Sequence, residues 1–188
     1  MKTLVTLLVM LLVSAPALAR DVDGINIPDS FSLAGEKTPL VLNGAGYRKK
    51  FFIKVYVGAL YLSQPMNRAD QILDAPTARV MLLHFVRNVS TDQLATAWRE
   101  GVAANQSTLA VQRLHARIGQ FNAMMHDLRA GDELRLELLA RGDTRVWINN
   151  DLRGTVSGGD FQRALLSAWL GPNPADSHLK RALLDGKE

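Results

Sequence analysis

The sequence predicts an α+β domain in which helices are layered on an antiparallel sheet. Three observations favour this class. Apolar and alternating segments typical of strands come first, two amphipathic helical segments follow, and further strands precede two C-terminal helices. Grouped strands and grouped helices, rather than a regular strand–helix alternation, are typical of antiparallel sheets. No internal repeat or low-complexity stretch divides the chain, so we expect a single domain.

Residues 1–19 have the pattern of a secretory signal peptide. Lys2 precedes an apolar run over residues 4–13, and the small-residue site Ala17-Leu18-Ala19 follows, which is typical of a cleaved leader. The alternative is a membrane anchor, but the run is too short to span a bilayer as a helix. We therefore predict cleavage after Ala19 and a periplasmic domain of residues 20–188 without a stable membrane anchor.

The next segments predict strands. Alternating apolar residues suggest β structure over residues 21–47, and the segment Phe51–Leu62 is apolar on both faces, as in a central strand covered on both sides. The glycine-rich run at residues 43–46 lacks the strand–turn–helix context of a phosphate loop. We interpret it as a bulge or a close approach of backbones.

The middle of the chain predicts three helices and one more strand. A short helix is expected near Ala69–Leu73, and a strand over residues 78–86 contains His84. Histidine can act as a general base, but no partner carboxylate is evident nearby, and a rim or core histidine is the commoner outcome. Ser90 and Gln93 form a capping-box pattern that opens the second helix. Trp98 lies on its apolar stripe and is predicted to be core.

The C-terminal part predicts a return to strands and then helices. Leucines and charged residues alternate over residues 133–138, which indicates a half-exposed strand. Asn149-Asn150-Asp151 is typical of a hairpin turn. A helix is expected over residues 160–170, and a last helix with Asn173 as its cap and Pro174 at its first position.

Composition excludes several classes of function. The formal net charge is +4, and acidic and basic residues are interspersed, so we expect no nucleic-acid partner. The chain has no cysteine, which excludes thiolate catalysis and cysteine-based metal sites. His115 and His126 lie about 16 Å apart along a predicted helix and cannot share a metal. We predict no metal, no cofactor and no recognisable catalytic group.

The motif around the predicted central strand resembles the signature of the chalcone isomerase-like proteins. Residues 44–48 read Gly-Ala-Gly-x-Arg, and residues 49–62 read Lys-x-Phe-Phe-x-Lys-Val-Tyr-Val-x-x-Leu-Tyr-Leu. The similarity continues through residues 120–122 to residues 170–172, and is fairly specific to the secreted bacterial branch. It implies the open-faced sandwich of the chalcone isomerase fold.

The resemblance also implies where a site would lie. Catalytic members close a chalcone ring with an arginine, a threonine and a tyrosine with an asparagine. Arg48 matches the arginine, whereas Tyr56 stands in the threonine's place, as in the fatty-acid-binding plant members. The catalytic tyrosine and asparagine fall near Val89–Ser90 and Ala97 and are missing, and a small hydroxyl residue falls near Gln162. These departures argue against isomerase activity.

Arg48 and Tyr56 together suit a carboxylate. Arginine offers a forked, permanently charged donor, and a buried phenol adds a second hydrogen bond. Phe52, Leu60 and the apolar stripes of the predicted helices are expected to hold an apolar tail. Along one extended strand, however, the pair would lie about 26 Å apart, so the chain must turn tightly around residues 48–50 if they are to share a ligand. The alternative is that Arg48 is a solvated turn residue and Tyr56 is satisfied within the core.

Three functions are compatible with these features. The first is a periplasmic, non-catalytic protein that binds a fatty acid or a similar hydrophobic carboxylate. The second is a structural or interaction protein without a small ligand, which co-purifying lipid would argue against. The third is a chalcone isomerase-type intramolecular lyase.

Overall fold

The computed structural model describes residues 19–185, so residues 1–18 of the predicted leader lie outside the described residues. Its centre is a seven-stranded sheet in which every neighbouring pair is antiparallel, in the order β3-β4-β5-β6-β7-β8-β9. The strands are β3 (Ser30–Phe31), β4 (Leu40–Lys50), β5 (Ile53–Leu62), β6 (Arg79–Phe85), β7 (Glu133–Leu138), β8 (Asp143–Ile148) and β9 (Asp151–Ser157).

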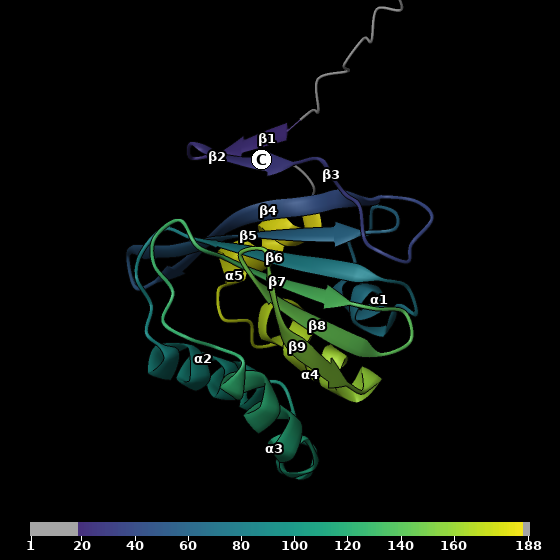
Figure 1. Cartoon of the computed structure of the whole chain (residues 1–188), viewed down its shortest axis with the longest axis vertical. Coiled ribbons are helices and arrows are strands. Elements are labelled where there is room, and N and C mark those ends of the chain that lie inside the picture. Colours follow the sequence, from purple (N-terminus) through teal and green to yellow (C-terminus); the bar gives the residue numbers. More distant parts are fainter. Residues whose placement is uncertain (1–18, 186–188) are drawn as a thin grey trace, which may run out of the picture.

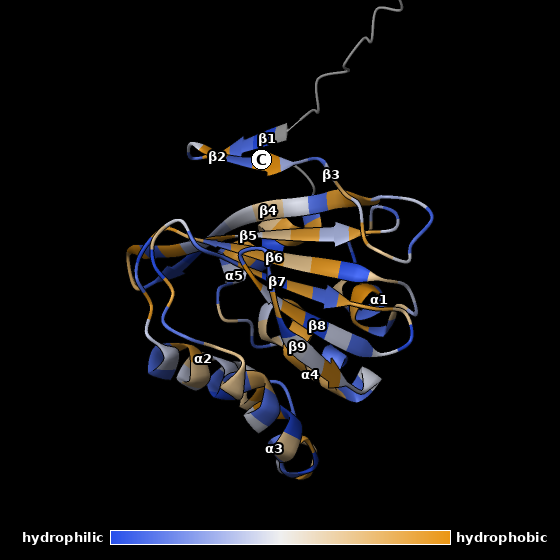
Figure 2. Ribbon diagram, in the orientation of Figure 1, coloured by the Kyte–Doolittle hydropathy of each residue, from blue (hydrophilic) through white to orange (hydrophobic). Residues whose placement is uncertain are grey.

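Helices cover one face of this sheet (Figure 1). They are α1 (Ala69–Asp74), α2 (Thr91–Ala103), α3 (Thr108–Ala123), α4 (Gly159–Leu170) and α5 (Ser177–Asp185). α5 packs on β4, and α4 contacts α1, α2 and β8. Hydrophilic and hydrophobic residues alternate along α2 and α3, as expected of helices with one buried side (Figure 2). The predicted α+β layering of helices on an antiparallel sheet is thus confirmed.

A small hairpin covers part of the other face. β1 (Ala19–Val22) and β2 (Ile25–Pro28) form a separate two-stranded sheet. Val22 and Ile27 from this hairpin lie in one apolar cluster with Val57 and Val80 of the central strands. β5 is therefore buried on both faces, as its apolar residues predict. Within residues 19–185, no helix is both long and apolar enough to cross a membrane.

The uncovered part of that face, on β7 and β8, is polar. Arg135 stacks between Phe31 and Trp147, with its guanidinium carbon 5.2 and 4.7 Å from the two ring centroids. Its Nε also donates to Glu137 at 3.1 Å. These contacts shield the carboxylate of Glu137, which is buried. The sequence instead predicts a strand whose charged residues, including Glu137, face solvent.

The central strand begins later than predicted. β4 extends to Lys50, which pairs with Ile53, so only Phe51 and Phe52 remain to form the turn. Phe51 adopts the left-handed conformation, with φ at 59°. Both phenylalanines are exposed to solvent, at 86% and 97%, so Phe52 cannot wall a binding site as the sequence suggests.

The glycine-rich run brings β4 close to α5, as predicted. The register of β4 against β5 shifts between Leu42 and Gly44, which marks a bulge. A Cβ added to Gly46 would lie 2.6 Å from the Cβ of Ala182 in α5. The buried amide of Asn43 reinforces this contact, because its Nδ2 donates to the carbonyl of Leu183 at 2.7 Å.

The sequence predicts the start of α2 correctly and the start of α5 incorrectly. Ser90 and Gln93 form the expected capping box at the start of α2. The last helix instead begins at Ser177, where Asp176 accepts hydrogen bonds from the backbone amides of His178 and Leu179. The predicted cap, Asn173, donates to the carbonyl of Ala104 and so ties the preceding loop to the end of α2.

Candidate functional site

The β4–β5 hairpin brings Arg48 and Tyr56 together. The two residues are direct register partners across the hairpin, and side chains of such partners lie on the same face. The guanidinium carbon of Arg48 lies 5.7 Å from the centroid of the Tyr56 ring, within range of a cation–π contact. The separation expected along an extended strand therefore does not arise, because the chain reverses at Phe51 and Phe52.

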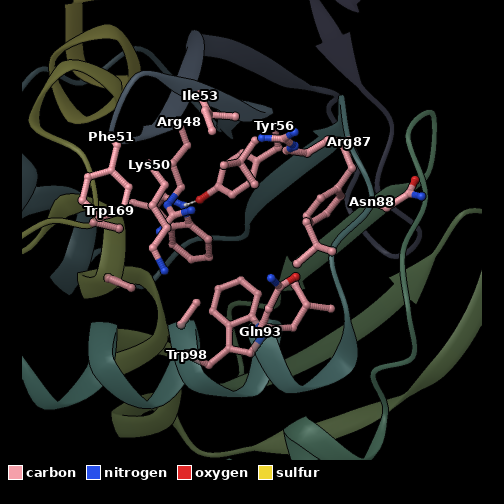
Figure 3. Close-up of a pocket in the computed structure, with 17 residues that line it drawn as sticks. Arg48, Lys50, Phe51, Ile53, Tyr56, Arg87, Asn88, Gln93, Trp98 and Trp169 are labelled. Atoms are coloured by element: carbon pink, nitrogen blue, oxygen red, sulfur yellow. Dashed lines mark hydrogen bonds between the residues drawn. The ribbon is translucent and has the colours of Figure 1, made fainter.

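This pair lies at one side of a cavity of about 390 Å³, a size typical of small-molecule sites. Figure 3 shows Arg48 and Tyr56 across the cavity from Trp98 and Gln93, which α2 contributes, with Trp169 of α4 beside them. The apolar part of the wall consists mainly of Val55, Phe85, Leu94, Ala97, Trp98 and Ala168. The site is therefore an apolar cavity between strand β5 and helices α2 and α4, with a polar side.

Among residues 19–185, the charged residues that line the cavity are all cations. They are Arg48, Lys50 and Arg87. Within the described part of the chain, none of the three forms an ion pair with a carboxylate. The negative charge of Asp176 lies close enough to raise the pKa of Tyr56, but Asp176 does not line the cavity. Its carboxylate accepts a hydrogen bond from the Lys49 backbone amide and caps α5. The cavity is thus electrostatically suited to an anion.

The Tyr56 hydroxyl is oriented by a neighbouring indole. Tyr56 as a residue is 6% exposed, and its hydroxyl oxygen accepts a hydrogen bond from Trp169 Nε1 at 2.8 Å. Burial raises the pKa of Tyr56 to about 12, although the positive charge of Arg48 and the Trp169 hydrogen bond act in the opposite direction. The phenol is therefore protonated at neutral pH and can donate its own hydrogen to a bound group.

Trp98 is buried, as predicted, but it also lines the cavity. It packs edge-on against Trp169, with ring centroids 5.4 Å apart. Its Nε1 is buried and has no hydrogen-bond partner among residues 19–185. The sequence does not identify Trp169 or Arg87 as site residues, and it favours a core role for Trp98 over a role in ligand contact. A clue was present in the sequence: a tryptophan predicted to be buried normally needs an acceptor for its indole N–H, so each such tryptophan is a candidate for a polar contact.

The positions aligned with the family's other functional residues divide into two groups. Val89 and Ala97 line the cavity with apolar side chains, whereas Ser90, the other residue aligned near the tyrosine, caps α2 and is not among the lining residues. Gln162 is not among the lining residues. Its side chain is buried elsewhere, where it accepts from Arg79 and donates to the carbonyl of Leu139. Leu60 is also buried outside the cavity, in the main core, and so does not hold a tail there.

The histidines do not contribute to this cavity. His84 has a carboxylate neighbour that the sequence analysis did not identify, because Glu133 lies opposite it on β7, with Nδ1 and Oε1 3.4 Å apart. Strand pairing brings together residues that are distant along the chain. His115 and His126 are exposed on the surface.

Comparison with known proteins gives a family and a fold. The family model described as chalcone isomerase-like matches residues 19–185. No curated protein is matched. A solved structure, that of a fatty-acid-binding protein from Arabidopsis thaliana, is similar with a TM-score of 0.68 and 16% identity, over 86% of this chain and 92% of the other. This likeness shows a shared fold. Because the family match spans nearly the whole sequence, the chain belongs to the chalcone isomerase-like family.

Proposed function

We propose that this protein binds a fatty acid or a similar hydrophobic carboxylate without transforming it. The observation that carries the proposal is the pairing of Arg48 and Tyr56 at the polar side of an apolar cavity, which no acidic residue lines among residues 19–185. The fold shared with a protein named as a fatty-acid-binding protein supports the same ligand class.

The ligand carboxylate would bind between Arg48 and Tyr56. The guanidinium supplies a charge-assisted, forked pair of donors, and the phenol donates once more while Trp169 fixes its oxygen. The aliphatic tail would lie against Val55, Phe85 and the aromatic face of Trp98. Of the tail contacts that the sequence suggests, this arrangement keeps the apolar stripe of α2 and omits Phe52 and Leu60.

The apolar residues at the aligned tyrosine and asparagine positions favour binding over isomerisation. Positioned acid–base groups typically contribute about 10²–10⁴-fold to a rate, and Val89 and Ala97 supply none. We expect the purified protein not to accelerate chalcone cyclisation above the uncatalysed rate. Turnover that disappears in Arg48→Ala would instead support the lyase function.

The proposed location is the periplasm, reached through cleavage of residues 1–19. This part of the proposal rests on the pattern of a short apolar run followed by the small-residue site Ala17-Leu18-Ala19.

Titration calorimetry with dodecanoate tests the ligand class and the head-group site. Arg48→Ala should weaken binding by about 1.5–3 kcal/mol, more than tenfold in affinity, because it removes charge-assisted hydrogen bonds. Tyr56→Phe removes one neutral donor and should cost about 0.5–1.5 kcal/mol. Dodecanol, with the same chain but no carboxylate, should bind more weakly to the wild type and be insensitive to Arg48→Ala.

Arg113→Ala is the matched control, because Arg113 is exposed on α3 and does not line the cavity. It should bind dodecanoate like the wild type, and thermal melts should show all variants folded. Equal affinity of Arg48→Ala and wild type would refute the head-group assignment. No binding of dodecanoate by any form would favour a structural or interaction protein.

A further inference from the structure

The tip of the β4–β5 hairpin carries large apolar side chains on its surface. Phe51 and Phe52 are 86% and 97% exposed, and the adjacent Ile53 is half-exposed. Phe51 and Phe52 are consecutive and form the two-residue turn at the apex of the β4–β5 hairpin. Single exposed apolar residues are common on protein surfaces, but a contiguous group of this kind marks an interaction site.

The backbone of this turn is unfavourable for the residue that occupies it. Phe51 has φ at 59°, and two-residue hairpin turns normally place glycine, asparagine or aspartate where φ is positive. Bulky residues are rarely found in this region. Neither solvation nor backbone preference therefore explains a phenylalanine at this position, whereas a binding role does.

Cations surround the apolar apex. Arg48, Lys49 and Lys50 precede it on β4, and Lys54 follows on β5. Lys54 pairs with Asp23, while Lys49 and Lys50 are exposed and form no ion pair within the described residues. An aromatic apex with a basic rim is complementary to a surface with anionic head groups over an apolar interior.

We propose that the β4–β5 turn docks this protein onto an anionic lipid surface, with Phe52 inserted among the head groups and Lys49 and Lys50 above it. A lipid surface is favoured over a protein partner because it accepts a convex apolar apex at any orientation, whereas a protein would need a matching pocket. Phe51 and Lys50 also line the cavity. Docking by the turn therefore places the cavity's polar side next to the lipid.

The docking surface does not depend on the proposed ligand, so each can fail separately. Vesicle binding is measured with the processed protein purified after export, with its N-terminus checked by mass spectrometry. The vesicles are phosphatidylglycerol–phosphatidylcholine mixtures or phosphatidylcholine alone. The wild type should float with the anionic vesicles, less with neutral ones, and less at high salt, since charge attraction is screened. Saturation with dodecanoate should not abolish this binding.

Phe52→Ser tests the apex without touching the cavity. It should lower partitioning into anionic vesicles by about tenfold or more, from the transfer free energy of one phenylalanine. Leu109→Ser is the matched control, because Leu109 is 60% exposed on α3. Partitioning of this control should equal that of the wild type.

A labelling experiment gives an independent measurement. The chain has no cysteine, so Phe52→Cys and Leu109→Cys can each be labelled at one site with a polarity-sensitive fluorophore. Emission should shift to the blue on addition of anionic vesicles for the label at position 52 only. Absence of vesicle binding, equal partitioning of Phe52→Ser, or equal shifts at both labels would overturn the proposal and leave a protein partner as the occupant of this turn.

Discussion

The Tyr56 phenol combines burial with an unused donor. Its oxygen accepts from Trp169, its ring stacks under the Arg48 guanidinium, and its own hydrogen can be donated to a ligand. Ionisation of this group would place a negative charge in an apolar environment, which is why burial raises its pKa to about 12.

This raised pKa predicts a loss of stability at alkaline pH. The folded state holds the Tyr56 proton more tightly than the unfolded state, so the contribution is fully present below pH 10 and is lost as pH rises through about 12. Between these limits, the stability advantage of the wild type over Tyr56→Phe should shrink by roughly 2–3 kcal/mol. Urea unfolding of both proteins from pH 9 to 12 measures it. If the unfolding free energies of the wild type and Tyr56→Phe changed in parallel with pH, a raised pKa of Tyr56 in the folded state would be contradicted.

Arg79 is a second buried polar residue, and its role is structural. It is 4% exposed, and its Nη1 donates to the carbonyls of Ile72 and Leu73 at the end of α1. Burial lowers the pKa of its guanidinium. These bonds satisfy carbonyl groups that a helix C-terminus leaves unpaired.

Arg79→Ala should therefore lower the free energy of unfolding by about 3 kcal/mol or more, because it leaves several buried acceptors unsatisfied. Arg163→Ala is the control, since Arg163 forms an exposed ion pair with Asp74, also in α1. That change should cost less than about 1 kcal/mol. Denaturant titrations compare the two variants, and similar losses would argue against a structural role for the buried arginine.

At the level of residues, the sequence supports only part of the candidate site. Arg48 and Tyr56 were identified through the resemblance, and their meeting depends on a turn whose position a strand pattern does not give. Phe52 is predicted to contact the ligand tail but is exposed, because an apolar sequence pattern does not distinguish a phenylalanine in a turn from one in a buried strand. The hydrogen bond from Trp169 to Tyr56 joins residues far apart in the chain, and no local pattern encodes such a contact.

Among the elements, the packing of α5 on β4 depends on small residues. Gly44 and Gly46 allow the helix to approach the strand closely. The two glycines meet different parts of Ala182. A Cβ at Gly46 would meet the side-chain Cβ of Ala182, whereas a Cβ at Gly44 would overlap its backbone carbonyl.

This difference predicts selective rescue. Gly46→Ala and Gly44→Ala should each cost about 1–3 kcal/mol through overpacking. Adding Ala182→Gly, which alone costs about 1 kcal/mol in helix propensity, should relieve Gly46→Ala but not Gly44→Ala, because a backbone carbonyl remains. Double-mutant cycles by chemical denaturation measure the coupling. Equal coupling for both glycines would show that α5 shifts as a whole.

The elements were predicted best where the signal is local. The capping box of α2 requires only residues three positions apart, and it forms as expected. The sequence predicts the start of α5 too early, because the side chain of Asn173 makes a tertiary contact with the end of α2 instead of capping a helix. Similarly, the burial of Glu137 follows from the stacking of Arg135 between rings contributed by other strands.

For the whole molecule, the N-terminal hairpin is part of the fold. β1 pairs with β2 from Ala19 to Val22. Val22 contributes to the apolar cluster on the face of the sheet opposite the helices. Cleavage after Ala19 would therefore leave nearly all of this hairpin in the mature chain.

We expect the exported protein to begin at Arg20 and, after a high-salt wash that weakens charge attraction to lipid, to be recovered in the soluble periplasmic fraction. The physical reason is the short apolar run that ends in a small-residue cleavage site. N-terminal sequencing of the fractionated protein provides the measurement. Recovery of a chain that retains residues 1–19 in the membrane fraction would identify an anchor instead.

The placement of the three tryptophans allows occupancy of the cavity to be followed by intrinsic fluorescence. Trp98 and Trp169 both line the cavity, whereas Trp147 lies on the opposite face of the sheet, stacked with Arg135. A guest entering the cavity changes the surroundings of the first two indoles and leaves the third unchanged. In a Trp147→Phe variant, all intrinsic indole fluorescence would arise beside the cavity, so that ligands can be screened by emission alone, without any attached dye.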